Sequence, residues 1–294
     1  MKLLVTGANG FIGRHLISHL SQAHEVFALV RDRHQSFPDE RVSVIATDLG
    51  SALEPNDLPT KIEVIIQLAQ ANALFPDGAN ELLAVNTGST QHLLDYGRLA
   101  GAKRFILAST GDVYGRRFGP CRETDPVEPT TFYAVTKRAS EMLVQAYSGY
   151  MQTSVLRLFH PYGSDQSDRL IPRLARAIQE QKAIRLHKGD RPHLTPTHIN
   201  DVIIALEGAI NSSYSGIVNV AGDRVVSMRE LAEEIGAVLA TEPLFEMDDE
   251  DSADLNGDNA LMKQVFGTWS MVTLRDGLLH TFKREEVGEC QAHV

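Results

Sequence analysis

Cysteine is scarce in this chain of 294 residues, which contains only Cys121 and Cys290. Two cysteines cannot build a disulfide framework, and neither stands in a spacing typical of metal ligands, so we expect a protein of the reducing cytoplasm. Long apolar runs are missing too, because no stretch of the sequence reaches the roughly 18 residues that a membrane-spanning helix needs. The first expected strand starts at Lys2, so we expect no signal peptide.

Positive charge is in deficit, with 28 Lys and Arg against 38 Asp and Glu and a formal net charge of -10 at pH 7. Nucleic acids and anionic membranes are bound mainly through clustered Lys and Arg, so neither is an expected partner. The acidic run at 248–254 is interpreted as a solvated loop rather than a metal site. An apolar content of 43% is typical of a globular protein with one large domain or two modest ones.

Short apolar runs alternate with helical patterns through the first half of the chain. Several runs consist almost wholly of Val, Ile, Leu and Phe, which is typical of strands covered on both faces. Strict alternation of strand and helix predicts an α/β fold with a doubly wound parallel sheet and right-handed crossovers. The expected strands are 2–6, 25–30, 42–46, 64–68, 104–109 and 154–158, and the expected helices are 13–21, 81–100 and 133–150.

The pattern loosens after Gly163. Residues 170–181 and 228–239 are expected to form amphipathic helices, whereas 217–221 is an expected strand that rejoins the main sheet. A smaller C-terminal domain is therefore predicted to be interleaved with the first. The predicted boundaries are 1–163 and 197–222 for a dinucleotide-binding domain, and 164–196 and 223–294 for a substrate-binding domain.

A glycine-rich turn follows the first expected strand and opens the first helix. Gly7, Gly10 and Gly13 permit a tight turn and bring backbone N–H groups close to a pyrophosphate, whose charge a helix N-terminus favours. A glycine triplet alone is weak evidence. Its position between a strand and a helix is the context that a dinucleotide-binding fingerprint needs.

The end of the second expected strand distinguishes between cofactors. An acidic residue there hydrogen-bonds the ribose hydroxyl of NAD, whereas an arginine accepts the additional phosphate of NADP. Val30 stands at the acidic position and Arg31 follows it, which favours NADP. In the alternative interpretation, Asp32 reaches the ribose and Arg31 is a solvated loop residue.

Tyr133 and Lys137 stand four residues apart in TTFYAVTKRASE and therefore share one helix face. Free tyrosine has a pKa of about 10, and a nearby positive charge lowers such a pKa by roughly 1 to 3 units. Lys137 would thereby make Tyr133 a usable proton donor or acceptor. The alternative is an ordinary amphipathic helix with one aromatic residue and one surface lysine.

Over nearly its whole length the sequence resembles the extended, epimerase-like branch of the short-chain dehydrogenase/reductases, the NAD(P)-dependent epimerase/dehydratase family. The motifs that carry the resemblance are TGANGFIG at 6–13, QLAQ at 67–70, VNTGSTQHLL at 85–94, ASTGDVYG at 108–115, the Tyr133 and Lys137 pair, and LRLFHPYG at 156–163. The resemblance implies a Rossmann fold. It also implies hydride transfer between a substrate carbon and a nicotinamide, coupled to proton transfer at the attached oxygen.

The resemblance assigns roles to individual residues. Tyr133 would exchange the proton, Lys137 would lower the pKa of Tyr133 and hold the nicotinamide ribose, and Thr110 would bind the reacting oxygen. Thr110 alternatively satisfies a turn, and Asn86 serves either in a catalytic water relay or only to hold its helix. The implied cofactor-binding residues are Gly7, Asn9, Gly10, Phe11, Ile12, Gly13, Arg31, Asp48, Leu49, Leu68, Ala69, Tyr133 and Lys137.

The substrate side departs from the family pattern at three places. His160 replaces the asparagine of R-x-x-N-x-Y-G, in which Arg157 is the arginine. Leu194 stands where enzymes of nucleotide-diphosphate sugars often carry an arginine that contacts the diphosphate. Gly111 and Asp112 stand where dehydratases carry Asp and Glu, which makes dehydration less favoured than epimerisation or ketone reduction. The residues that could compensate for Leu194 are Arg185, Arg191 and His193.

Three functions stay open. The first is an epimerase or related oxidoreductase that transfers hydride at a carbinol or ketone carbon of a nucleotide sugar or related carbohydrate. The segments 219–239 and 258–278 resemble those of the sugar-nucleotide branch of the family, which favours this function. The second is an NADPH-dependent reductase of a smaller ketone or aldehyde, favoured by Arg31 and Leu194. The third is a non-catalytic nucleotide-sensing regulator, which the presence of both Tyr133 and Lys137 disfavours. The resemblance also implies a homodimer built on the helices that contain Asn86 and Tyr133.

Overall fold

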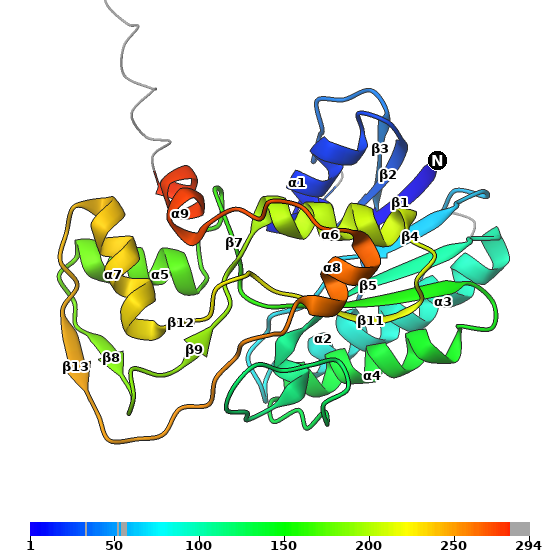
Figure 1. Ribbon diagram of the computed structural model, residues 1–294. Coiled ribbons are helices and arrows are strands. Elements are labelled where there is room, and N and C mark those ends of the chain that lie inside the picture. Colours follow the sequence, from blue (N-terminus) through cyan, green and yellow to red (C-terminus); the bar gives the residue numbers. More distant parts are fainter. Residues whose placement is uncertain (33, 52, 54–57, 283–294) are drawn as a thin grey trace, which may run out of the picture.

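A parallel sheet forms the centre of the larger part of the molecule in this computed structural model, which describes residues 1–32, 34–51, 53 and 58–282 (Figure 1). Within those residues, seven strands pair in the order β11-β6-β5-β4-β1-β2-β3. The strands are β1 (Lys2–Thr6), β2 (Glu25–Val30), β3 (Val42–Ala46), β4 (Val64–Gln67), β5 (Arg104–Thr110), β6 (Gln152–Leu158) and β11 (Gly216–Val220). The predicted doubly wound sheet is confirmed.

The strand order reverses between β1 and β4. From β1 the chain builds outward through β2 and β3, then returns to the other side of β1 and continues through β4, β5 and β6. In such sheets, ligands bind outside the carboxyl ends of the strands at this reversal. β11 joins the far edge in parallel register with β6, which confirms that the late strand rejoins the main sheet.

Both faces of the sheet are covered by helices. Leu3 and Val5 point into a core cluster with α1 (Phe11–Leu20) and α6 (Ile199–Asn211), whereas Leu4 points into the opposite cluster with α3 (Ser89–Ala100) and α4 (Phe132–Ala146). Alternate side chains of a strand face opposite sides of its sheet, so each strand needs apolar residues at every position. This accounts for the continuous apolar runs of the sequence.

The helix predicted over 81–100 is interrupted in the structure. It consists of α2 (Ala79–Leu82), a π-helix at Leu83–Gly88, and α3. The wider turn changes the pattern of backbone hydrogen bonds, and nearby hydroxyl groups take up its carbonyls. The Asn86 carbonyl accepts hydrogen bonds from Thr90 Oγ1 (2.7 Å) and Ser140 Oγ (2.7 Å), and Ser140 lies on the neighbouring α4. The π-helix is thereby attached to α4.

The smaller part of the molecule has its own apolar core. It is formed by α5 (Leu170–Gln179), α7 (Met228–Leu239) and α9 (Leu274–Phe282), of which α7 starts at a capping box between Ser227 and Glu230. Three pairs of short strands complete this part and its connections to the larger one. They are β7 (Pro161–Tyr162) with β10 (Thr197–His198), β9 (His193–Leu194) with β12 (Val226–Ser227), and β8 (Ile184–Leu186) with β13 (Phe245–Met247).

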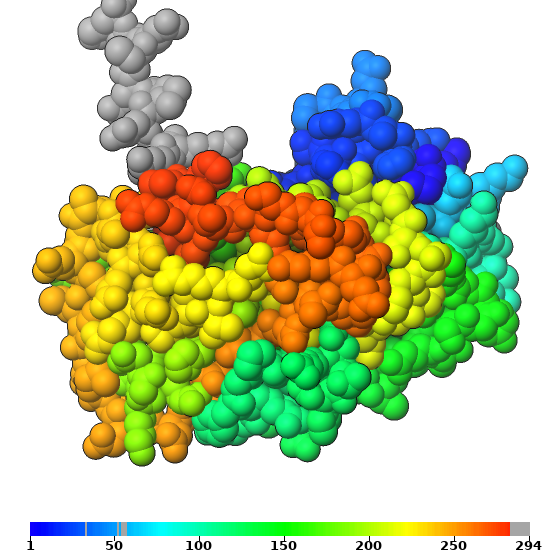
Figure 2. Space-filling view, viewed as in Figure 1, coloured from blue at the N-terminus to red at the C-terminus, as the bar shows by residue number. Residues whose placement is uncertain are grey.

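The C-terminal segment lies across both parts, as the orange and red surface of Figure 2 shows. Leu261, Phe266 and Met271, in and after α8 (Ala260–Phe266), pack against the core beside α6. Leu274 and Leu278 of α9 belong to the core of the smaller part. Residues 261–271, which the sequence assigned to the substrate-binding domain, therefore pack with the large sheet. No helix of the described residues has the length and apolar character needed to cross a bilayer.

Candidate active site

The glycine turn between β1 and α1 is sterically closed to side chains. Gly7 has a φ of +66°, and a Cβ on it would lie 2.7 Å from the Ala69 backbone nitrogen. A Cβ on Gly13 would lie 2.2 Å from the Gly7 carbonyl oxygen. Both contacts are with backbone, so a side chain could not be accommodated by a rotamer change. The turn also packs against the residues after β4, where the Ala69 N–H donates to Thr6 Oγ1 (3.2 Å).

The same turn fits a pyrophosphate. α1 begins after Gly10 without a side-chain cap and has no acidic residue in its first turn. The positive end of the helix is therefore open to an anion, and the glycines let that anion approach the backbone. The other residues predicted to bind the cofactor here lie around this turn: Asn9 is exposed in it, Phe11 and Ile12 start α1, and Leu68 and Ala69 directly follow β4.

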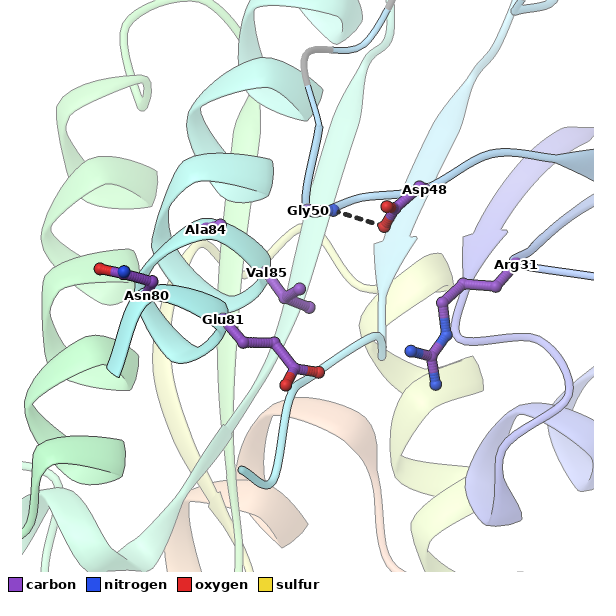
Figure 3. A pocket seen from close by; sticks show the side chains of 7 residues that line it. All are labelled: Arg31, Asp48, Gly50, Asn80, Glu81, Ala84 and Val85. Carbon is purple, nitrogen blue, oxygen red and sulfur yellow. Dashed lines mark hydrogen bonds between the residues drawn. The ribbon is translucent and has the colours of Figure 1, made fainter. Parts of the chain in front are cut away.

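A pocket of about 380 Å³ lies between β2, the loop after β3 and the start of α2 (Figure 3). Arg31 and Asp48, two of the predicted cofactor-binding residues, both line it, and Asp48 Oδ1 accepts a hydrogen bond from the Gly50 N–H (2.9 Å). Figure 3 shows the Glu81 carboxylate directed into this pocket from the side opposite Arg31. Two carboxylates thus share the pocket with one guanidinium, and no motif of the sequence pointed to Glu81.

Two predicted residues near this pocket have other surroundings. Leu49 is buried in the core cluster that contains α3, so its side chain contributes packing. Asp32 is exposed, and its Oδ1 accepts a hydrogen bond from the His34 N–H (2.9 Å). The alternative in which Asp32 serves the ribose therefore has less support than Arg31, which lines the pocket.

Tyr133 and Lys137 lie on the first turns of α4, whose N-cap Thr131 accepts a hydrogen bond from the Ala134 N–H (3.1 Å). The Tyr133 hydroxyl donates to Gln70 Oε1 (2.8 Å), just beyond β4. The Lys137 ammonium is fully buried and donates to the Ala108 carbonyl on β5 (2.6 Å). Both side chains thus point from the helix towards the carboxyl ends of the central strands.

The electrostatics of this pair differ from the sequence expectation. Burial raises the pKa of Tyr133 above its ordinary value, Asp112 raises it further, and Arg169 opposes the shift. Burial lowers the pKa of Lys137 to about 8, with Glu141 opposing. In this structure the Lys137 ammonium is directed at a carbonyl oxygen, and it is not among the groups that shift the pKa of Tyr133. Tyr133 consequently holds its proton at neutral pH.

Thr110 ends β5 and caps the short 3-10 helix that follows. Its hydroxyl donates to Asp112 Oδ2 (3.1 Å) and accepts from the Asp112 N–H (3.2 Å), so the turn-satisfying interpretation describes its present contacts. A Cβ on Gly111 would lie 2.5 Å from the Phe159 ring. That contact explains why position 111 carries no side chain, and hence why Asp112 stands without a second carboxylate beside it.

Asn86 holds three elements together. Its Oδ1 accepts from the Ala71 N–H (2.8 Å), and its Nδ2 donates to Thr136 Oγ1 on α4 (3.0 Å). The side chain is buried, and these bonds connect the π-helix to both α4 and the segment after β4. The geometry therefore favours the helix-holding role over a water relay.

A buried ion pair lies beneath the site. Arg157 on β6 donates two hydrogen bonds to Glu141 of α4 (3.0 and 2.7 Å), and Ser109 Oγ donates to the same carboxylate (2.6 Å). The Arg157 guanidinium also stacks on the Tyr114 ring at 4.6 Å. Because Glu141 lies one helical turn after Lys137, this pair fixes the rotation of α4 over the sheet. Arg157 is therefore a structural residue.

The substrate-side departures have distinct explanations. Leu194 is buried in the core of the smaller part, so its position has no access to a ligand. Each residue that could have compensated is paired within the described chain: Arg185 with Asp248, Arg191 with Asp254, and His193 with Asp254. His160 differs from all of these, because its Nε2 is buried without a partner among the described residues.

Arg169 is a site residue that sequence reasoning missed. It is exposed at the N-cap of α5 in the smaller part, yet its charge acts on the Tyr133 hydroxyl group. Only the tertiary structure brings the charge of Arg169, in the smaller part, close enough to act on Tyr133 in the larger part.

The sequence pattern of the NAD dependent epimerase/dehydratase family matches residues 3–221. The chain belongs to this family. The family assignment confirms the predicted resemblance and makes the protein an NAD(P)-dependent enzyme of the epimerase/dehydratase type. The cofactor-fitting turn and the Tyr133 helix described above lie within the matched residues.

Individual relatives cover most or nearly all of this epimerase/dehydratase chain. It is 27% identical to the uncharacterized UDP-glucose epimerase YtcB of Bacillus subtilis, over 95% of this chain and 96% of that protein. It is 30% identical to the GDP-6-deoxy-D-mannose reductase of Pseudomonas aeruginosa, over 82% of this chain and 81% of that one. Among solved structures, MoeE5 in complex with UDP-glucuronic acid and NAD superposes with a TM-score of 0.84 at 28% identity, covering 96% of this chain and 98% of that one.

Proposed function

We propose that this enzyme is an NAD-dependent epimerase of a UDP-linked sugar. The observation that carries the proposal is the position of Tyr133, whose hydroxyl lies at the carboxyl end of β4, next to the glycine turn that fits a pyrophosphate. Relatives of two kinds support the substrate class, because one is described as a UDP-glucose epimerase and another binds UDP-glucuronic acid together with NAD.

In this proposal the protein positions the substrate and handles its protons. Nicotinamide, when bound, supplies reversible hydride transfer and a positive charge. Tyr133 gives its proton to the ketone oxygen or takes it from the alcohol, and a positive charge nearby favours the phenolate that the second direction requires. Thr110 turns its hydroxyl from Asp112 to the reacting oxygen. The buried Lys137 holds its helix turn against β5 and offers its remaining N–H groups to the cofactor ribose.

The choice between NAD and NADP depends on the pocket of Figure 3. Arg31 supplies one positive charge for an additional phosphate, but Asp48 and Glu81 line the same pocket and repel such a group. Carboxylates accept hydrogen bonds from ribose hydroxyls, which agrees with NAD. The second candidate function, an NADPH-dependent reductase of a smaller ketone, is favoured only by Arg31. It predicts stoichiometric consumption of NADPH, whereas an epimerase regenerates its cofactor in each cycle.

Tyr133→Phe tests the proposed chemistry most directly. Proton transfer contributes roughly 100- to 10,000-fold to rates, so we expect conversion of UDP-glucose or UDP-glucuronic acid to its epimer to fall by at least about 100-fold. NAD binding, measured by its stabilisation against thermal unfolding, should be nearly unchanged. Tyr147→Phe is the matched control, because Tyr147 ends the same helix and bonds Asp95 instead. Wild-type turnover in Tyr133→Phe would exclude this mechanism.

We also propose a homodimer that pairs across the π-helix and α4. Leu83, Val135 and Met142 on these helices are large apolar residues with 46–57% of their surface exposed. Exposed apolar residues that gather on one face are typical of a protein interface, and a two-fold axis would bury the same face of both copies. Sedimentation at micromolar concentration tests this, and Met142→Glu should shift the protein towards the monomer. A monomeric wild-type protein would refute the dimer.

A further inference from the structure

The Tyr133 hydroxyl is the start of a short chain of side-chain amides. It donates its proton to Gln70 Oε1 (2.8 Å), and Gln70 Nε2 donates in turn to Asn72 Oδ1 (3.3 Å). The proposed mechanism gives neither amide a role, although the chain begins at the oxygen atom that exchanges the proton. Gln70 and Asn72 are both exposed, so their amide groups can turn without disturbing the core.

The backbone beneath Gln70 is fixed on both sides. The Ala69 N–H donates to Thr6 Oγ1 (3.2 Å), and the Ala71 N–H donates to Asn86 Oδ1 (2.8 Å). These two bonds hold the backbone that carries Gln70 at the end of β4. Its side chain therefore stays within reach of the phenol, and the amide at its end is the part that is free to reorient.

A second contact keeps this segment against the start of α4. The Phe75 ring stacks on the Phe132 ring with 4.9 Å between their centroids, and Phe132 directly precedes Tyr133. The segment after β4 and the first turn of α4 are thus joined at two points. The contact between Gln70 and Tyr133 is consequently part of a positioned arrangement of two elements.

An amide can serve a tyrosine in either protonation state. Its oxygen accepts a hydrogen bond from a phenol, and its NH₂ group donates to a phenolate, which has no proton to give. When a substrate oxygen takes the hydroxyl hydrogen of Tyr133, a lone pair of the phenol oxygen is likewise left for a donor. Turning the Gln70 amide end for end presents that donor. Asn72 is an amide too and can turn with it, so that both hydrogen bonds persist.

We propose that Gln70 and Asn72 form an amide pair that turns with the proton of Tyr133. While Tyr133 keeps its hydrogen, the Gln70 oxygen accepts from the phenol, as observed. During proton exchange, Gln70 Nε2 donates to the Tyr133 oxygen and stabilises the phenolate. Both amides keep all their protons, so no proton passes through them and Gln70 is a positioning residue. The proposal rests on the proposed function, in which Tyr133 exchanges a proton with the substrate.

The charges around Tyr133 leave room for such a donor. Burial and Asp112, after β5, raise the pKa of Tyr133, whereas Arg169 of α5 and the hydrogen bond with Gln70 lower it. Lys137, on the same helix, donates to a carbonyl of β5 and is not among the groups that shift this pKa. A donor at the phenol oxygen therefore acts against burial at the atom where the negative charge develops.

Other charged groups of the elements packed against α4 are engaged elsewhere within the described residues. Glu81 of α2 is directed into the cofactor pocket (Figure 3). Glu141 of α4 pairs with Arg157 of β6, and Asp95 of α3 accepts a hydrogen bond from Tyr147 (2.6 Å). Their charges remain the same when Gln70 is replaced, so a change in the titration of Tyr133 would report on the amide.

Titration of the Tyr133 phenolate tests the amide pair without any substrate. The full-length protein with NAD is titrated with base, and the phenolate is followed by its near-ultraviolet absorbance, with the signal of Tyr133→Phe subtracted. Gln70→Leu keeps a similar size and has no donor, so it should raise the midpoint by about one pH unit. Gln91→Ala is the matched control, because Gln91 hydrogen-bonds Asp95 within α3.

Turnover provides a second readout. With a UDP-sugar at neutral pH, Gln70→Leu should lower kcat about tenfold and leave KM within about twofold, because Gln70 acts on Tyr133 and not on the nucleotide. The variant should melt like the wild type, since the replaced side chain is exposed. A merely structural role would instead lower the melting temperature and leave the titration midpoint of Tyr133 unchanged.

Asn72→Asp tests whether the second amide takes part. An ionised carboxylate only accepts hydrogen bonds, so it holds the Gln70 nitrogen away from Tyr133. We expect Asn72→Asp to raise the midpoint of Tyr133 more in the wild-type background than in Gln70→Leu, where only the added charge acts. The difference between the two backgrounds should be at least about half a pH unit.

A midpoint in Gln70→Leu that is equal to or lower than that of the wild type would overturn the proposal. An equal effect of Asn72→Asp in both backgrounds would exclude Asn72 and overturn the amide pair as well. Failure of the proposed function appears in a different assay, as unchanged turnover of a UDP-sugar in Tyr133→Phe. The titration needs no turnover, so the two failures are distinguishable.

Discussion

The nucleotide end and the substrate end of this enzyme are built in different ways. At the nucleotide end, backbone makes the site: Gly7 and Gly13 lie so close to neighbouring carbonyl and amide groups that no side chain fits. At the substrate end, side chains make the site, and Tyr133, Lys137 and Thr110 are each hydrogen-bonded within the chain. Tyr133 bonds Gln70, Lys137 bonds Ala108, and Thr110 bonds Asp112.

This contrast shows when a sequence motif is sufficient to predict a site. A backbone site needs a few glycines within one turn, so its signal is local. A site of side chains depends on how helices and strands are placed against each other, which here rests on buried contacts such as the Arg157–Glu141 pair and the Asn86 bonds. Four substitutions test this difference between the two ends.

Removing Glu141 should have the largest effect on stability, because it breaks the buried contacts that position α4 at the substrate end. Glu141→Ala leaves the fully buried Arg157 without its carboxylate, and breaking such a pair costs about 3–5 kcal/mol. Urea unfolding measures this loss in the free energy of unfolding. The exposed pair of Lys182 and Glu180 provides the control, since Glu180→Gln should leave stability unchanged. Equal stability of both variants would mean that the buried pair does not hold α4.

Lys137 should make stability depend on pH. Its folded-state pKa of about 8 lies below the ordinary 10.5, so between these values the unfolded chain binds more protons than the folded protein. Stability relative to Lys137→Met should therefore rise from pH 8 to pH 10.5, by up to about 3 kcal/mol. Other titrating groups are common to both proteins and cancel in the difference. A difference that does not change over this interval would show that burial does not shift the Lys137 pKa.

Gly13→Ala tests the backbone-built end. Its Cβ would meet two carbonyl oxygens, of Gly7 at 2.2 Å and Ala8 at 2.7 Å, so the turn must open. We expect NAD binding to weaken by at least about 100-fold, or about 2.7 kcal/mol. Gly149→Ala is the control, because a Cβ there has nothing within 4 Å. Retained affinity in Gly13→Ala would show that the turn is more adaptable than its contacts indicate.

Arg31→Ala should have the smallest effect. If Arg31 contacts an additional phosphate, NADPH binding should weaken by about tenfold while NAD binding stays the same. Thermal shifts with each cofactor measure both affinities. Arg41→Ala serves as control, because Arg41 is paired with Asp39 and lies outside the pocket. Equal shifts with both cofactors in the wild type would leave no role for Arg31 in cofactor selection.

The large sheet was predictable because each of its strands can be recognised from its own residues. Residues 2–6, 25–30 and 42–46 form strands with the predicted bounds, since a strand buried on both faces has to be apolar at every position. The π-helix at Leu83–Gly88 was not predictable, because it is stabilised by Ser140 and Thr136 of a helix about 50 positions later. α6 escaped detection as well, since apolar residues predominate along it and leave little contrast between its two faces.

The candidate site likewise contains some residues that the sequence predicted and others that it did not. The glycines, Tyr133, Lys137 and Thr110 were found because their spacing is local, although their roles stay predictions. Glu81 and Arg169 were missed, since nothing near them in the sequence indicates that α2 lines the same pocket as Arg31 or that the charge at the start of α5 acts on Tyr133. Leu194 had looked like a lost ligand, and the structure shows a core residue.

The sequence by itself determined the doubly wound sheet, the glycine turn and the pairing of a tyrosine with a lysine on one helix face. These properties follow from periodicity and from the steric freedom of single residues, which act over a few positions. Only the tertiary structure decided that Lys137 turns to the Ala108 carbonyl, that burial keeps the proton on Tyr133, and that the charge of Asp112 acts on the Tyr133 hydroxyl group. Desolvation and charge depend on neighbours brought from distant parts of the chain, so no local pattern could have specified them.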